Sequence, residues 1–148
     1  MTKTDAASLP EFDLYSFTPY RLAMAAQKLS EMLAKHYRSQ FGISIPEWRV
    51  LVHLAHSGDV SVRDIEARVG MEKSKVSRAA SRLETSGLIV KTVNDDDRRL
   101  IRLTLSDKGR TLMSELLPLA DAFQTEITAK LGDTLDGFEA GLDKLLED

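Results

Sequence analysis

The sequence predicts a mainly α-helical protein with one small β-hairpin, and three observations support this fold class. Apolar residues recur three and four positions apart along most of the 148 residues, which is the period of amphipathic helices. Residues 88–105 instead contain runs of apolar residues, or apolar residues that alternate with polar ones, as is typical of short strands. Serine and glycine residues stand at the expected starts and ends of the helices and divide the pattern into separate elements.

The hairpin is expected to form from two strands, residues 88–93 and residues 101–105. In the second strand, three apolar residues alternate with an arginine and a threonine, so one face would be half-buried. The polar and acidic residues between the strands predict a turn, and Arg98 and Arg99 stand near its tip. A basic hairpin beside a pair of helices is the layout of a winged helix-turn-helix, in which the hairpin, called the wing, can place an arginine in a DNA minor groove.

A pair of short helices precedes the wing. Ser61 and Asp64 are spaced as a capping box that starts the first helix, and Gly70 permits the turn that follows it. The second helix, about residues 73 to 85, has a narrow apolar stripe of small residues that would pack against a neighbour. Its opposite arc is polar and basic, so it can donate to phosphates and base edges. The DNA contacts predicted on this arc are Lys73, Ser74, Lys75, Ser77, Arg78 and Arg82.

Long amphipathic helices flank this core. Thr18-Pro19 opens the first, and a capping box of Ser44 and Glu47 starts the next. Ser106 caps a further long helix in which Pro118 predicts a kink. We therefore expect one domain over residues 1–148. Its dimerisation helices would span residues 17–43 and 106–148, and its winged helix-turn-helix DNA-binding core residues 44–105.

The flanking helices carry more apolar surface than the DNA-binding core can bury. A second copy of the chain would bury this surface, and two-fold dimers are the commonest oligomers. Helix-turn-helix proteins use such dimers to read palindromic double-stranded DNA operators. The alternative is a monomer whose terminal helices fold back on the core.

Five segments together resemble one known family, the multiple-antibiotic-resistance repressor (MarR) family of bacterial transcription regulators. The segments are residues 42–51, 69–78, 82–84, 86–89 and 97–109. The resemblance extends over about residues 17 to 147, and the wing with its Ser-Asp-Lys-Gly exit is the most specific part. It implies that Arg99 enters a minor groove, that Asp97 holds the Arg99 guanidinium, and that the terminal helices interlock in a dimer. Arg98 is expected at a phosphate. Glu72 stands where the family often has Ser, Thr or Asp as a helix cap.

Composition is that of an ordinary globular protein, with 43% hydrophobic and 29% charged residues. No apolar run approaches the roughly 18 residues of a membrane span, and the N-terminus does not read as a signal peptide. We therefore expect a cytoplasmic protein with no membrane partner. Cysteine is absent, which excludes disulfides, a thiolate nucleophile and a thiol redox sensor.

The charge is unevenly distributed along the chain. The net charge is −3, but residues 61–110 hold 12 Lys and Arg against 8 Asp and Glu, whereas the remainder holds 8 against 15. The basic surplus therefore coincides with the predicted DNA-binding motif, and local potential matters more than the total for binding nucleic acid.

The family resemblance also implies a small-molecule effector, since members often hold an aromatic or phenolic anion between the dimerisation helices and the core. Trp48 and Tyr37 could stack on a ring, and Arg21 or His36 could pair with a carboxylate. The alternative is that Trp48 belongs to the core and Arg21 is solvated. The sequence thus predicts a repressor released by a small aromatic or other anionic ligand.

Other functions have weaker support in the sequence. His53, His56 and His36 allow a metal-responsive regulator, but no cysteine or carboxylate pair completes a site, so no metal or cofactor is expected. No nucleophile–base constellation or phosphate loop is present, so an enzyme is not expected. A winged-helix protein-interaction module without DNA binding remains the main alternative, although such a module would need more apolar surface on its exposed helix.

Overall fold

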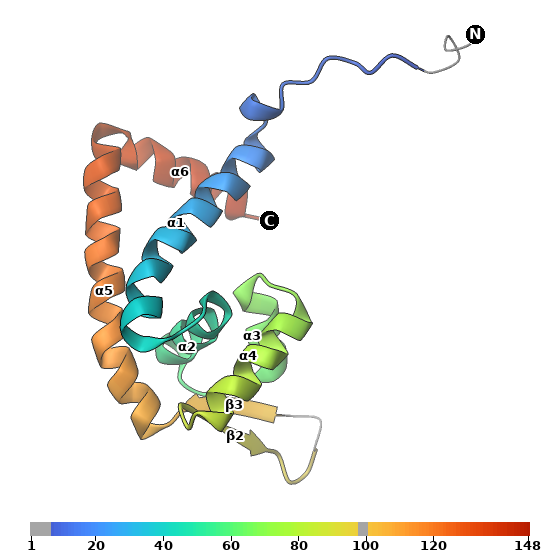
Figure 1. The fold of residues 1–148 in the computed structure, drawn as a ribbon. Coiled ribbons are helices and arrows are strands. Elements are labelled where there is room, and N and C mark those ends of the chain that lie inside the picture. The colour runs from blue at the N-terminus through green and yellow to red at the C-terminus, as the bar shows by residue number, and fades with distance from the viewer. Residues whose placement is uncertain (1–6, 98–100) are drawn as a thin grey trace. The chain divides into compact units, whose positions relative to one another are not determined.

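A computed structural model of the chain describes residues 7–97 and 101–148. Arg98 and Arg99 lie outside the described residues, whereas every other predicted contact lies within them. The predicted fold class is confirmed, because the chain is mostly helical and carries a small antiparallel sheet (Figure 1). In order along the chain the elements are η2 (Leu14–Ser16), α1 (Thr18–Phe41), α2 (Ile45–Ser57), β1 (Val60–Ser61), α3 (Val62–Val69), α4 (Lys73–Thr85), β2 (Ile89–Val93), β3 (Ile101–Leu105), α5 (Asp107–Leu131), η3 (Gly132–Thr134) and α6 (Leu135–Leu146).

The contacts divide the chain into two units, residues 1–32 and residues 33–148, which are described separately. In the first unit, none of residues 7–32 is buried. Its aromatic rings contact one another edge to face, with centroids 5.0 Å apart for Phe12 and Phe17 and 5.8 Å apart for Tyr15 and Tyr20. This segment therefore has no core of its own within the part of the chain that the structure describes.

The second unit contains the hydrophobic core. Helix α2 lies at its centre and packs against α3, α4, α5 and β3. On α4, the small apolar residues predicted to face inward do so: Val76 is 1% exposed, Ala79 0% and Leu83 0%. This arrangement holds α4 rigidly on one side and leaves its other side open.

The sheet contains the predicted wing and one additional strand. Its order is β1-β3-β2, with Lys91 of β2 and Val60 of β1 both paired to Leu103 of the central strand. Leu103 is 1% exposed, as the alternation in residues 101–105 predicts. The sequence analysis missed β1 because a strand of two residues is too short to show a period.

Helix starts follow the predicted caps in most cases. At α2, Ser44 N donates to Glu47 Oε1 at 2.8 Å and Glu47 N donates to Ser44 Oγ at 3.3 Å, which completes the capping box. At α3, the structure shows only one of the two predicted bonds, from Asp64 N to Ser61 Oγ at 3.1 Å. Glu72 precedes α4 without a side-chain capping bond, as expected for glutamate.

The start of α5 is tied to the turn that follows α4. Ser106 Oγ donates to the Gly87 carbonyl at 2.6 Å, Ser106 N donates to the Leu88 carbonyl at 3.0 Å, and Lys108 Nζ donates to the Ser86 carbonyl at 2.8 Å. A Cβ on Gly109 would overlap the Leu88 carbonyl oxygen. The Ser-Asp-Lys-Gly sequence thus joins α5 to the end of α4. Helix α5 continues through Pro118 and ends at Leu131, with Gly132 as its C-cap.

Candidate nucleic-acid interface

The predicted contact residues of α4 share one exposed face. The residues of this face are Lys73, Ser74, Lys75, Ser77, Arg78, Ser81 and Arg82, all exposed. Because the buried stripe on the opposite side fixes the rotation of the helix, these side chains are displayed together by a rigid element. Their chemistry suits phosphate oxygens and base edges.

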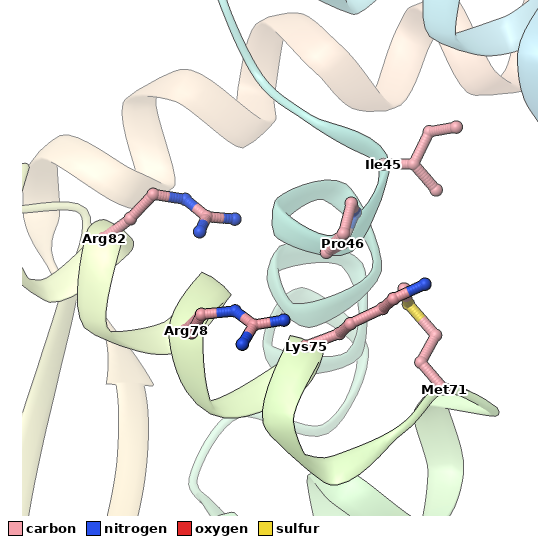
Figure 2. Close-up of a pocket in the computed structure, with 6 residues that line it drawn as sticks. All are labelled: Ile45, Pro46, Met71, Lys75, Arg78 and Arg82. Atoms are coloured by element: carbon pink, nitrogen blue, oxygen red, sulfur yellow. The ribbon is translucent and has the colours of Figure 1, made fainter.

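Three cations of this face form a row beside the start of α2. Figure 2 shows Lys75, Arg78 and Arg82 reaching from α4 along one side of a shallow pocket of about 400 Å³. Its other walls are Ile45, Pro46 and Met71. Three adjacent positive charges raise the local potential and favour an anionic partner at this surface.

A carboxylate from α2 orients the last of these cations. Glu47 Oε2 lies 3.5 Å from Arg82 Nε, and the Glu47 side chain is only 13% exposed against 50% for Arg82. Since the other Glu47 oxygen accepts the Ser44 amide, the carboxylate is held in place by its capping box. The pair engages Arg82 through Nε, while the Arg82 side chain stays half exposed. Sequence analysis assigned Glu47 only to the capping box, because the contact with Arg82 joins two helices far apart in the chain.

The tip of the wing begins with the expected turn. Asn94 Oδ1 accepts hydrogen bonds from the amides of Asp96 at 2.8 Å and Asp97 at 2.9 Å, which closes an Asx turn. Asp97 is half-buried at the end of the described part of the tip. The predicted pairing of Asp97 with Arg99 involves a residue outside the described range.

The central strand of the wing is fastened by a salt bridge that the sequence analysis did not predict. Arg102 Nε lies 2.7 Å from Asp59 Oδ1, and Arg102 Nη2 donates to the Asp59 carbonyl at 3.0 Å. Arg102 is on β3 and Asp59 follows α2, so the bridge ties the central strand to the loop that ends α2. The alternating pattern placed Arg102 on the polar side of the strand but gave no indication of its partner.

The four residues predicted to border an effector are in different environments. Tyr37 is 2% exposed, and its ring stacks on that of Trp48 with centroids 5.3 Å apart. Trp48 is half-buried and packs against the core, whereas His36 is exposed on α1. Arg21 is exposed in the first unit. The structure therefore brings Tyr37 and Trp48 together.

The histidines of α2 form no evident metal site. In the part of the chain that the structure describes, no group of three or more His, Cys, Asp or Glu side chains is placed to hold an ion. Burial lowers the pKa of His53, and the positive charges of Arg68 and His56 lower it further. Within the same described ranges, no helix is long and apolar enough to cross a membrane.

Comparison with known proteins relates the chain to transcription regulators. The sequence model of the MarR family matches residues 41–100, which include α2 to β2. The chain is 30% identical over 121 residues to the transcriptional repressor MprA of Escherichia coli K12, over 80% of this chain and 68% of that protein. It is also 34% identical over 91 residues to the transcriptional repressor MdtR of Bacillus subtilis, of which it spans 58%.

Solved structures agree with the sequence comparisons. The crystal structure of a MarR family transcriptional regulator from Silicibacter pomeroyi superposes with a TM-score of 0.78 at 26% identity. The match includes 93% of this chain and 100% of that one, so it extends well beyond the helix-turn-helix. The family model, the relatives and the fold agree, and the chain belongs to the MarR family of transcriptional regulators.

Proposed function

We propose that this protein is a homodimeric, sequence-specific DNA-binding regulator that represses transcription. The observation that carries the proposal is the exposed polar and basic face of α4, held by a buried apolar stripe and flanked by the wing. Two relatives are named repressors, which supports repression over activation. Since such a regulator acts on chromosomal DNA, we place it in the cytoplasm.

In this proposal α4 enters the major groove and the wing reaches the adjacent minor groove. Ser74, Lys75, Ser77 and Arg78 approach base edges or neighbouring phosphates, and Lys73 and Arg82 bind phosphates. At the wing, Arg99 inserts into the minor groove with Asp97 holding its guanidinium, and Arg98 meets a phosphate. The Glu47–Arg82 contact supports the assignment of Arg82, because a guanidinium held by a carboxylate loses less side-chain freedom on binding.

Dimerisation is supported by apolar surface that this single chain leaves uncovered. In the first unit, Leu9 is 92% exposed, Phe12 65% and Tyr15 77%, and at the C-terminus Leu145 is 62% and Leu146 78% exposed. Residues 17–43 and 106–148 would form the dimerisation region, and residues 44–105 the DNA-binding core of the single domain. The two α4 helices would then read half-sites about 34 Å apart in a palindromic operator.

We further propose that a small aromatic or other anionic ligand releases the operator. The stacked Tyr37–Trp48 pair supplies an aromatic surface, of which Trp48 is the more accessible ring. Arg21 and His36, both exposed, supply positive charge in this proposal. A ligand that favours the DNA-incompetent dimer by a few kcal/mol is sufficient to change operator occupancy.

The proposal is tested by selecting bound duplexes from random DNA and sequencing them. The expected result is a palindromic consensus whose affinity falls steeply between two salt concentrations, because phosphate contacts release counterions. A consensus without symmetry contradicts the dimeric arrangement. Absence of salt-sensitive DNA binding contradicts the proposal as a whole and favours the protein-interaction module.

A further inference from the structure

The tip half of the hairpin, residues 91–93 and 101–102, has little apolar packing to hold it. Ile89, at the other end of β2, is 2% exposed and Leu103, in the middle of β3, is 1% exposed, so both strands are fixed to the core there. In the tip half, by contrast, Val93 is 40% exposed and Ile101 is half-buried. Hydrophobic burial therefore fixes the root of the hairpin and contributes less toward its tip.

Two ion pairs join the tip half to the rest of the DNA-binding core, one from each strand. Lys91 Nζ on β2 lies 3.6 Å from Glu84 Oε1 on α4. Arg102 Nε on β3 lies 2.7 Å from Asp59 Oδ1, and Arg102 Nη2 donates to the Asp59 carbonyl at 3.0 Å. Arg102 belongs to the last residue pair but one on the tip side of the β2–β3 ladder, and Lys91 belongs to the pair before it. The ion pairs therefore act where apolar packing declines.

The two ion pairs lie on opposite faces of the hairpin. Lys91 is directly opposite Leu103, and paired residues of antiparallel strands share a face, so Lys91 lies on the face that Leu103 turns to the core. Arg102 is next to Leu103 in β3 and lies on the other face. There it pairs with Ser61 of β1, which makes Asp59 its diagonal neighbour. A hairpin held from both faces cannot tilt in either direction without stretching one of the ion pairs.

A small change in the angle of the hairpin would have a large effect at its tip. The five residues from Ile89 to Asn94 span about 17 Å at about 3.3 Å per residue. A tilt of about 15° would then move the tip by about 4 Å, which is most of the roughly 6 Å width of a minor groove. The four side chains are 40% to 57% exposed, so each ion pair adds little to the stability of the fold. A modest bias is nevertheless sufficient to select one orientation of the wing.

We propose that Asp59 and Glu84 are positioning residues for the wing. Through Arg102 and Lys91 they set the angle of the hairpin relative to α4, and this angle sets how strongly the protein prefers A·T-rich sequence beside its half-sites. The proposal rests on the function proposed above and names two residues on which its specificity for flanking sequence depends. Both side chains are anionic, so they act through their partner cations and not by contact with phosphates.

The first test measures the position of the wing in the full-length protein without DNA. The chain has no cysteine, so nitroxide labels attach only to introduced sites, Asp95→Cys at the tip and Ser81→Cys on α4. Labelled chain is diluted with unlabelled chain, so that pulsed electron paramagnetic resonance reports distances within one chain. Asp59→Asn and Glu84→Gln should each broaden the distance distribution or shift its maximum by about 4 Å. An unchanged distribution in either variant overturns the positioning role of that residue.

The second test compares two duplexes with identical half-sites, one with A·T-rich flanks and one with G·C-rich flanks. The wild-type protein should bind the A·T-flanked duplex more tightly, and Asp59→Asn or Glu84→Gln should each lower the ratio of the two affinities about two- to fivefold. A role in stability alone would change both affinities together and leave their ratio as it was. Glu115→Gln, which removes an exposed carboxylate on α5, is the matched control and should leave the ratio unchanged.

A charge exchange completes the design. Glu84→Lys alone should lower the ratio, and Glu84→Lys combined with Lys91→Glu should restore it, because the exchange rebuilds the ion pair and conserves the net charge. Equal wild-type affinities for the two duplexes, an unchanged ratio in the variants, or no restoration by the exchange overturns the role in specificity. If the protein binds no DNA at all, the function proposed above fails, whereas the label distances still decide whether Asp59 and Glu84 position the wing.

Discussion

Gly109 provides a sharp test of how α4 is held in place. It lies in the first turn of α5, where a Cβ would overlap the Leu88 carbonyl oxygen and lie 3.3 Å from Leu105 Cδ2. The Leu88 carbonyl cannot move freely, because it accepts the Ser106 amide at 3.0 Å. Gly109→Ala must therefore displace α5 from the turn after α4 or break this hydrogen bond.

The size of the expected loss of stability follows from these two contacts. Overpacking a tight contact costs about 1–3 kcal/mol, and loss of one hydrogen bond costs about 1 kcal/mol. The expected loss in the free energy of unfolding is therefore roughly 2–4 kcal/mol, a large part of the stability of a typical domain. The same displacement should weaken operator binding, because α5 is tied to the end of α4 by Ser106 and Lys108.

The measurement is urea unfolding of both proteins at one protein concentration, since dimer stability depends on concentration. Gly141→Ala is the matched control, because Gly141 also lies within a helix and a Cβ there meets no atom within 4 Å. Alanine is the better helix former, so this control should be neutral or stabilise by up to about 1 kcal/mol. Equal stability of Gly109→Ala and Gly141→Ala would refute the argument.

Three further predictions concern DNA binding and pH. Arg78→Ala should reduce the free energy of binding to operator DNA by about 1–3 kcal/mol in a gel-shift titration, whereas Lys130→Ala should leave it unchanged. An equal loss of affinity on random DNA would show that Arg78 contacts a phosphate and not a base. Arg99→Ala should weaken binding most on operators with A·T-rich flanks, where the groove is narrow, and unchanged affinity there would contradict the minor-groove assignment. The pKa of His53 is lowered in the folded state, so protons bind the unfolded state more readily. Stability should therefore fall as pH drops below about 6.5, and His53→Gln should flatten this dependence in urea titrations; an unchanged slope would exclude His53 as its source.

Elements whose signals are local can be predicted from the amino-acid sequence. The capping box of Ser44 and Glu47, the left-handed turn at Gly70 and the two faces of α4 were all predictable, because each depends on residues within about one helical turn of one another. The resemblance to the MarR family also predicted how the helix-turn-helix core and the wing are arranged. The strand β1 escaped prediction, since its two residues acquire their conformation by pairing with β3 and not from a pattern of their own.

The contacts between distant side chains, in contrast, become visible only in the folded chain. The Glu47–Arg82 and Asp59–Arg102 contacts join segments separated by tens of residues. The same is true of Tyr37, for which the sequence allowed a place in a ligand site and the structure shows a buried ring stacked on Trp48. Helical periodicity determines which face of an element is apolar, but it does not identify the partner of that face. The partners depend on how the helices pack, and packing is set by the shapes of many side chains acting together.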